Sequence, residues 1–175
     1  MTTPEPADVA IRRRRPLGVG LRADLISPRD IGRDISLATT EAGTDLAMVD
    51  GFDNLCQDLA VGLSTLRGSD VFNQRFGFLG LSALTTQTSP VLAREGVRAA
   101  VAEFLAGDPR VREITDVQLV NPMSDPSGAG RRTLAVRVSF DAITGESASI
   151  SGVGVASGAA WGAVETTIAG ADDDR

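Results

Sequence analysis

The spacing of apolar residues in the first half of the chain predicts an amphipathic helix over about residues 53–67. Its apolar positions are Leu55, Leu59, Leu63 and Leu66. Positions three or four residues apart share one face of a helix, so this stripe needs another surface to cover it. Gly68 follows the last leucine. A glycine commonly ends a helix at such a point, because it reaches the left-handed conformation without a Cβ clash.

A second helix is predicted from Ser89 to Ala106. Ser89 and Pro90 suit a helix start, since a hydroxyl residue favours the cap position and proline tolerates the first helical position. The apolar positions that follow are Val97, Val101, Phe104 and Leu105, and Gly107 stands after them. We expect the two helices to pack together through one apolar stripe each.

Beyond Gly107 the pattern changes from helical to alternating, which predicts strands. Val117 and Leu119 alternate with polar neighbours, and residues 133–141 give the clearest strand. In that strand the apolar positions are Leu134, Val136, Val138 and Phe140. A third strand is expected near residues 147–150, although the glycines that follow weaken the pattern.

Two short extended segments precede the first helix, at residues 35–38 and 45–49, and they predict a small hairpin around a turn at residues 41–43. The loop after that helix, residues 69–78, contains Phe72, Phe76 and Phe78 and is expected to pack inward. Together these elements predict an α+β fold in which two packed helices lie against a small antiparallel sheet.

The two ends of the chain lack a sustained period. Residues 1–34 contain four prolines and the arginines at 12–15, and they predict an N-terminal arm that is either disordered or ordered against a neighbouring subunit. The arginine run either meets an acidic partner surface or forms a solvated charge run. Residues 35–145 are the predicted domain, and residues 146–175 a flexible Gly/Ala-rich extension. Within it, Trp161 is a candidate anchor in a pocket of this chain or of a partner.

Composition narrows the classes of partner. The chain has 175 residues, a net charge of −6 and a pI of about 4.6. An acidic chain argues against binding to nucleic acid, which normally needs a concentrated basic surface. No apolar run approaches the length of a membrane span, so we expect a cytoplasmic protein without a membrane partner.

The chain lacks several residue types on which catalysis commonly depends. All 17 basic residues are Arg, and there is no Lys, no His and no Tyr. This excludes a Ser-His-Asp triad, a His metal ligand, a Schiff-base lysine and a P-loop lysine. Cys56 is the only cysteine and is expected to be a small, partly buried residue rather than a reactive thiol. We therefore expect no catalytic residue, no metal and no cofactor.

A motif between residues 45 and 77 has the order D-L-A-x-V-x-G-x-x-N-L, then L-x-T-x-x-G-S, then F-G. Its residues are Asp45, Leu46, Ala47, Val49, Gly51, Asn54, Leu55, Leu63, Thr65, Gly68, Ser69, Phe76 and Gly77. This motif resembles the sheath initiator of contractile tails, also called the tail-lysozyme-like baseplate wedge protein. That family occurs in contractile phages, phage-tail-like bacteriocins, type VI secretion baseplates and extracellular contractile injection systems. The resemblance spans roughly residues 35–143.

The resemblance implies a structural baseplate protein that templates the first sheath ring by β-strand addition and links the sheath to the baseplate. Its implied partners are the sheath subunit and the wedge and hub or spike proteins. Several copies would form a symmetric ring near the inner tube, within an assembled particle in the cytoplasm. Strand addition is physically reasonable, because an uncovered sheet edge offers unpaired amide and carbonyl groups to another chain. The hypothesis requires at least one free sheet edge.

The family carries an acidic-Pro-Arg triplet between the second helix and the next strand, and that triplet is associated with wedge assembly. Here it is Asp108, Pro109 and Arg110, where Asp replaces the usual Glu and shortens its reach. Pro109 fixes the backbone and holds Arg110 for bidentate contacts with carboxylates or carbonyl groups. The alternative is an ordinary helix-to-strand turn. The other candidate partner contacts are Arg75, Arg137 and Trp161.

Two other classes of function stay open, a baseplate adaptor without sheath contact and a hydrolase of cell-wall glycan. A glycoside hydrolase needs two carboxyl groups about 5–10 Å apart, one of them with a raised pKa. Carboxylates are plentiful, but none has a sequence context that marks it as the acid. A sugar cleft also offers stacking aromatic rings, and the chain has one Trp and no Tyr. We therefore disfavour the hydrolase.

Overall fold

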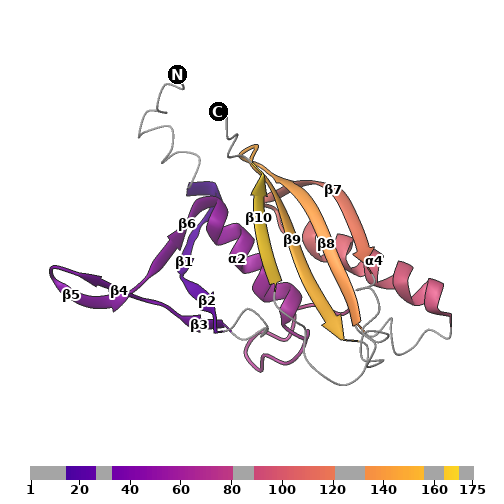
Figure 1. Ribbon diagram of the computed structural model, residues 1–175, viewed down its shortest axis with the longest axis horizontal. Helices are drawn as coiled ribbons and strands as arrows, with labels where there is room; N and C mark the ends of the chain where they lie inside the picture. The colour runs from indigo at the N-terminus through magenta and orange to yellow at the C-terminus, as the bar shows by residue number, and fades with distance from the viewer. Residues whose placement is uncertain (1–14, 27–32, 81–88, 121–132, 156–163, 170–175) are drawn as a thin grey trace, which may run out of the picture.

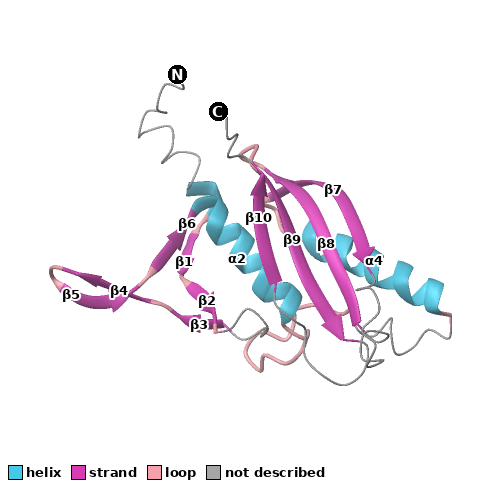
Figure 2. Ribbon diagram, viewed as in Figure 1, coloured by secondary structure: helices cyan, strands magenta, loops and turns pink. Residues whose placement is uncertain are grey.

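A computed structural model of the protein describes residues 15–26, 33–80, 89–120, 133–155 and 164–169 (Figure 1). These residues form a mixed α+β fold, as predicted (Figure 2). The helices are a short 3-10 helix, η1 (Arg15–Leu17), and two α-helices, α2 (Gly51–Ser64) and α4 (Pro90–Ala106). The strands are β1 (Val19–Leu21), β2 (Ala23–Leu25), β3 (Arg33–Ile35), β4 (Leu37–Thr40), β5 (Gly43–Leu46), β6 (Met48–Asp50), β7 (Val111–Val120), β8 (Thr133–Ala142), β9 (Ser147–Val155) and β10 (Val164–Ala169).

The main sheet has four antiparallel strands in the order β10-β9-β8-β7. In β8, Val138 and Phe140 are buried while Arg137 is exposed, so one face of the sheet belongs to the core and the other is open. Helix α4 packs against β7, and α2 contacts β9 and β10. The predicted strand at residues 133–141 and the predicted packing of two helices on a small antiparallel sheet are confirmed.

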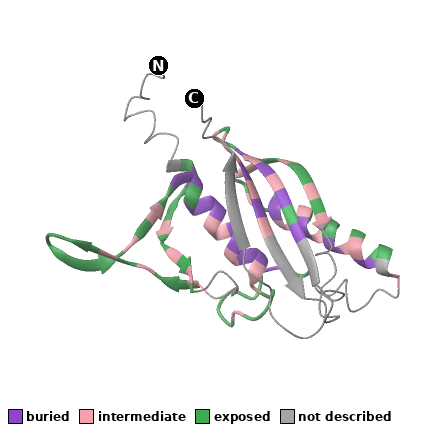
Figure 3. Ribbon diagram, in the orientation of Figure 1, coloured by how far each residue is buried: buried purple, intermediate pink, exposed green. Residues whose placement is uncertain are grey.

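The core lies between the helices and the sheet, where Figure 3 shows the buried segments of α2, α4, β8 and β9. Its largest fully buried side chains include Leu55, Leu59, Val97, Val101, Leu105, Val138, Phe140 and Ile150. Each helix therefore buries most of the stripe that its sequence period predicts, with Leu66 of the first stripe exposed and Phe104 of the second partly buried. Full burial of one such side chain contributes about 1.5–3 kcal/mol to the free energy of unfolding.

The boundaries of α4 agree with the prediction, but those of α2 do not. Helix α2 begins at Gly51 and ends at Ser64, and Leu66, expected on the buried stripe, is exposed. The chain turns extended at Thr65, whose carbonyl accepts the N–H of Phe78 at 2.8 Å, and the N–H of Arg67 donates to the Phe78 carbonyl at 3.2 Å. This long-range pairing ends the helix before the leucine period does.

The aromatic loop, residues 69–78, only partly packs inward. Phe78 is buried and meets Phe104 of α4 edge to face, with ring centroids 6.4 Å apart. Phe72 is instead 100% exposed, and its N–H donates to Asp70 Oδ1 at 2.8 Å in a tight turn. The expectation of an inward-packed loop is therefore wrong for Phe72, because this turn holds the ring in solvent.

Residues 15–26, expected within a free N-terminal arm, pack against helix α2 of their own chain. Leu17 is fully buried in the core, and β1 pairs with β6. Neither expected alternative, disorder or ordering against a neighbour, applies to this segment. Residues 1–14 and 27–32 of the expected arm lie outside the described residues, and they include the arginines at 12–14.

Three two-stranded ribbons, β1–β6, β2–β3 and β4–β5, meet at one point. The β4–β5 ribbon confirms the predicted hairpin. At the meeting point the N–H of Arg22 donates to Ala47 O at 2.8 Å, that of Ala47 to Ser36 O at 2.8 Å, and that of Ser36 to Arg22 O at 2.9 Å. We call this closed ring of three hydrogen bonds the three-way junction. Its ribbons extend away from the main sheet (Figure 1).

The expected flexible C-terminal extension contains two strands of the main sheet. Strand β9 is paired on both sides, by β8 and β10, so its ladder hydrogen bonds offset the weak strand preference of its glycines. Strand β10 is rich in β-branched residues, which favour a pleated surface. The expectation of a flexible extension is therefore wrong for β9 and β10, while Trp161 lies outside the described residues.

Candidate functional site

A groove of about 750 Å³ lies where the end of α2, the aromatic loop, the end of α4 and the start of β7 meet. Its apolar lining includes Leu59, Val61, Phe76, Phe78, Leu79, Ala100 and Phe104. Its charged lining consists of Asp58, Arg67, Arg75, Glu103, Asp108 and Arg110. The groove therefore brings together Arg75, Asp108, Pro109 and Arg110, four of the six residues that the sequence singled out as partner contacts.

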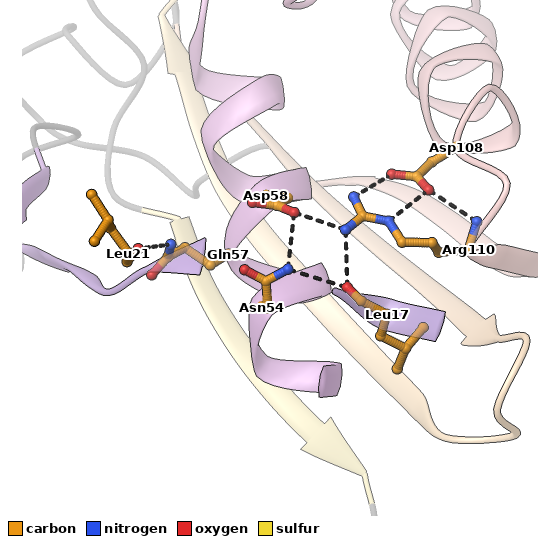
Figure 4. Close-up of polar contacts among 7 residues, drawn as sticks. All are labelled: Leu17, Leu21, Asn54, Gln57, Asp58, Asp108 and Arg110. Carbon is orange, nitrogen blue, oxygen red and sulfur yellow. Dashed lines mark hydrogen bonds and ion pairs between the residues drawn. The ribbon is translucent and has the colours of Figure 1, made fainter. Parts of the chain in front are cut away.

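Arg110 lies at one side of this groove and ties three parts of the chain together (Figure 4). Its Nη2 donates to Asp108 Oδ2 at 2.7 Å and its Nε to Asp108 Oδ1 at 3.0 Å. Its Nη1 donates to Asp58 Oδ2 on α2 at 2.8 Å and to the Leu17 carbonyl at 3.1 Å. One guanidinium group therefore joins the α4–β7 turn, helix α2 and the N-terminal segment. We call this set of contacts the Arg110 clamp.

The clamp shifts the protonation equilibria of its members. Hydrogen bonding to Asp108 raises the pKa of Arg110 further above its ordinary value, against the effect of burial and with a smaller contribution from Asp58. Burial favours the neutral form of Asp108, but the hydrogen bonds from Arg110 outweigh it and hold the pKa of Asp108 below its ordinary value. Both groups are therefore charged at neutral pH, and the clamp is an ion pair.

Two amides on α2 complete the attachment of the N-terminal segment. Asn54 Nδ2 donates to the Leu17 carbonyl at 3.1 Å and to Asp58 Oδ2 at 3.3 Å. Gln57 Nε2 donates to the Leu21 carbonyl at 2.8 Å, and its Oε1 accepts the N–H of Ala23 at 2.9 Å. The Gln57 amide thus bonds the strand edge as a neighbouring peptide group would. From the sequence, Asn54 is a motif residue without a structural role, and Gln57 is not singled out.

A signal for these amides was present in the sequence. Asn54, Gln57 and Asp58 recur at helical spacing beside the leucine stripe, so they form a polar stripe along one flank of α2. Asn54 is also buried, and its Oδ1 has no hydrogen-bond partner among the described residues. A buried amide needs a partner, which here is the Leu17 carbonyl 37 residues earlier in the chain.

The triplet itself is a helix-to-strand turn, the alternative considered from the sequence. The N–H of Arg110 donates to Asp108 Oδ1 at 2.9 Å, and the N–H of Val111 donates to the Asp108 carbonyl at 3.0 Å. Pro109 is exposed at this turn. The described contacts of Asp108 and Arg110 lie within the chain, so any contact with a partner would use the faces that remain open to the groove.

Of the other two candidate partner contacts, Arg137 does not line the groove. Arg137 is exposed on the open face of the main sheet, where its Nε donates to Ser151 Oγ of β9 at 3.1 Å. Trp161 lies outside the described residues. Among the candidate contacts that the structure describes, Arg75 and the triplet therefore share one site.

Two further observations concern possible metal ligands and the thiol of Cys56. The described residues contain no group of three or more His, Cys, Asp or Glu side chains that could hold a metal ion. Cys56 is buried, and burial, with smaller contributions from Asp53 and Glu146, raises its pKa to about 12, so its thiol is protonated at neutral pH. Within the same residues no helix has the length and hydrophobicity needed to cross a membrane.

Both borders of the main sheet are open among the described residues, because β7 pairs only with β8 and β10 only with β9. Beside β7 lies a hollow of about 230 Å³. It is lined by Val91, Arg94, Glu95, Arg98 and Leu119. Irregular pairing is confined to the first half of β7, and residues 116–120 pair regularly with β8. The second half of β7 is therefore a regularly paired strand at the edge of the sheet, and the hollow lies next to it.

Comparisons with known proteins add a partial structural likeness. No protein-family model matches the chain, and no curated protein matches it. A solved structure from Geobacter sulfurreducens, described as a candidate tail lysozyme, is 18% identical in sequence. The match covers 62% of this chain and 93% of that chain, with a TM-score of 0.45. The description belongs to that protein and assigns no activity to this chain.

Proposed function

We propose that the chain is a structural baseplate protein of a contractile tail, and that the edge of β7 accepts a strand from the first sheath ring. The observation that carries the proposal is the regular second half of β7 beside the 230 Å³ hollow. An open edge supplies main-chain hydrogen bonds to an added strand, and a neighbouring recess selects its side chains. The resemblance of residues 45–77 to sheath initiators points in the same direction.

The positions of the motif glycines support a structural role. Gly51, Gly68 and Gly77 have φ values of 64°, 87° and 102°, a region that favours glycine. A Cβ at Gly77 would lie 2.6 Å from the Thr65 carbonyl oxygen, so close approach of the backbone also requires glycine there. Gly51 begins α2, and Gly77 lies beside the Thr65 and Arg67 backbone that pairs with Phe78, so these two motif positions have a backbone reason to be glycine.

The recess beside β7 gives the added strand a means of selection. Side chains alternate along a strand, so an apolar residue of the incoming chain would enter the hollow between Leu119 and Val91. Charged groups of α4 at this hollow, including Glu95 and Arg98, would favour a strand with complementary charges. In this proposal the sheath subunit is the partner at β7, and wedge and hub or spike proteins contact other surfaces of a ring of copies.

A deletion and a pair of substitutions in α4 test the proposal in the organism that makes the particle. Deleting the chain should leave baseplates or tubes without extended sheath when particles are counted by electron microscopy. In complementation, Val91→Arg fills the recess with a charged side chain and should reduce sheathed particles at least tenfold. Leu92→Arg is the matched control, because Leu92 is similarly exposed but does not line the hollow. Normal sheaths in the deletion strain, or equal counts for the two substitutions, would contradict the proposal.

The hydrolase alternative is disfavoured by the clamp. Asp58 and Asp108 line the same groove, but both are bound to Arg110. A general acid needs a raised pKa, whereas the pKa of Asp108 is lowered. We expect no release of soluble glycan when the purified protein is incubated with peptidoglycan. The adaptor alternative predicts crosslinks in assembled particles to wedge and hub proteins only, with none to sheath.

A further inference from the structure

The regular half of β7 has two chemically different faces. Val117 and Leu119 pack against the core, whereas Asp116 and Gln118 are exposed on the open face of the sheet. Side chains alternate along a strand, so a strand added to this edge has the same two faces. One face lies on the side of α4, which packs against β7 (Figure 1). The other lies on the side of Asp116 and Gln118, so each face of the added strand meets different groups.

On the side of α4, the hollow beside Leu119 has an excess of positive charge. Its charged lining consists of Arg94, Glu95 and Arg98, which is two guanidinium groups and one carboxylate. The ion pair between Arg98 Nε and Glu95 Oε2 spans 3.7 Å, and its side chains are 50% and 61% exposed. An ion pair this exposed is screened by solvent and contributes little stability, so Arg98 can bind a second carboxylate. An Asp or Glu on this face of an added strand would therefore be attracted to the hollow.

On the open side, the edge of β7 has a negative charge. Asp116 is exposed, and its Oδ2 accepts a hydrogen bond from Gln118 Nε2 at 2.6 Å. The amide is neutral, so it does not compensate the charge of the carboxylate. Arg137 lies opposite Gln118 on β8, but its Nε donates to Ser151 Oγ of β9 at 3.1 Å, on the side away from the edge. A Lys or Arg on this face of an added strand would therefore lie beside the Asp116 carboxylate.

Because the two charges lie on opposite faces, the edge can select the register of an added strand. A shift of the strand by one residue moves every side chain to the other face. It would place the carboxylates of the strand beside Asp116 and its amines beside Arg98, and like charges at such short range are destabilising. The hydrogen bonds of the main chain are the same for any sequence, so the charge pattern supplies a selection that they lack.

We infer that the strand accepted by β7 has two faces of opposite charge. The face toward α4 carries an apolar residue flanked by Asp or Glu, and the face toward Asp116 carries Lys or Arg. This inference rests on the proposed function, because it specifies the partner of the same edge. It identifies the added segment by an alternation of acidic and basic residues around a central apolar residue. A strand of the same composition with its charges on the reverse faces is disfavoured.

Two synthetic peptides of the same composition, with blocked ends, test this inference. The matching peptide has the sequence TEKLKET, which places Leu and both Glu on one face and both Lys on the other. The reversed-face peptide, TKELEKT, exchanges the Glu and Lys residues. Both sequences read the same in either direction, so the result does not depend on whether the strand adds parallel or antiparallel. Each peptide is titrated into the isotope-labelled full-length protein, and its Kd is measured from the NMR shifts of the amides of residues 116–120.

The matching peptide should bind about tenfold more tightly than the reversed-face peptide at low salt, and high salt should reduce this preference because exposed charges are screened. Asp116→Lys should reduce the preference, and the double variant Arg98→Glu with Asp116→Lys should reverse it. Asp45→Lys is the matched control, because Asp45 is equally exposed but lies on β5 of the β4–β5 ribbon, and it should leave the preference unchanged.

The outcomes separate this inference from the proposed function. Equal affinities of the two peptides, or a preference that the double variant retains, would overturn the inference and leave strand addition at β7 intact. Absence of shifts in residues 116–120 with either peptide would instead contradict strand addition, and the inference with it. Circular dichroism checks that each variant folds. If the charge reversals do not fold, the neutral pair Arg98→Gln with Asp116→Asn takes their place and should abolish the preference.

Discussion

Replacing Arg110 with Ala removes the group that joins the N-terminal segment to the rest of the fold. The variant loses two bonds to Asp108, one to Asp58 and one to the Leu17 carbonyl. It also leaves the Asp108 carboxylate without the guanidinium that favours its charged form. We therefore expect the fold to persist with lower stability, and β1 and η1 to be the segments most affected.

The size of the effect follows from how exposed each partner is. The side chains of Arg110 and Asp108 are 23% and 18% exposed, so their ion pair is only partly screened, whereas Asp58 is 43% exposed and adds little. A hydrogen bond to a charged group contributes about 1.5–3 kcal/mol when it is well buried. After the discount for solvent, we expect a loss of about 2–3 kcal/mol in the free energy of unfolding. For a chain of this size that lowers Tm by about 5–10 °C.

Urea denaturation followed by circular dichroism measures this loss. Arg112→Ala is the matched control, because Arg112 is 54% exposed and its ion pair with Asp141 spans 3.4 Å; its expected cost is below about 0.5 kcal/mol. Arg110→Lys keeps the charge but not the planar guanidinium group. Its loss in free energy of unfolding should lie between those of Arg110→Ala and Arg112→Ala. Amide hydrogen exchange should increase in residues 17–23 of the Arg110→Ala variant. Equal stability of the Arg110→Ala and Arg112→Ala variants would refute the clamp.

The clamp also predicts how this difference depends on pH. The folded pKa of Asp108 lies below its ordinary value of 3.8, so the contribution of its ionised form is fully present above that value. It is lost as the pH falls through the lower, folded pKa. The stability gap between parent and Arg110→Ala should therefore persist from neutral pH down to about pH 5 and narrow only below the ordinary aspartate pKa. A gap that closes between pH 7 and 5 would contradict this assignment.

Two further predictions concern the motif around α2. Gly77→Ala should destabilise the fold by about 2–3 kcal/mol, since its φ is 102° and the added Cβ meets backbone; Gly68→Ala, with φ of 87° but open space, should cost only about 1 kcal/mol in the same denaturation assay. Equal losses of stability for the two substitutions would mean that the close approach of the Thr65 carbonyl to Gly77 does not matter. Cys56 should resist iodoacetamide at pH 8 in the native protein and react rapidly in urea, because burial keeps the thiol protonated. Rapid native labelling, read by mass spectrometry, would show that the thiol is accessible.

Local signals in the sequence were sufficient for much of the core. Helix α4 spans the predicted residues because Ser89, Pro90 and Gly107 mark its ends within the segment itself. Strand β8 shows its alternation directly, since one of its faces meets the core and the other is open. In both cases the information lies within a few residues of the element that it predicts.

Elements decided by distant contacts were not predicted. The leucine period continues to Leu66, but pairing with Phe78 ends α2 earlier. The N-terminal segment has no period of its own, and its place depends on Asn54, Gln57 and Arg110, of which Arg110 lies 93 residues from its acceptor Leu17. Strand β10 forms because β9 offers it an edge. These contacts join residues that are far apart in the sequence, so no local pattern predicts them.

The most direct test of the proposed function is a cryo-electron microscopy map of the assembled particle at a resolution that separates strands. The account predicts a strand from a sheath subunit paired with residues 116–120 of β7, with a side chain inserted in the hollow between Leu119 and Val91. A map in which the β7 edge is bare, or is covered by a segment of this same chain, would contradict it.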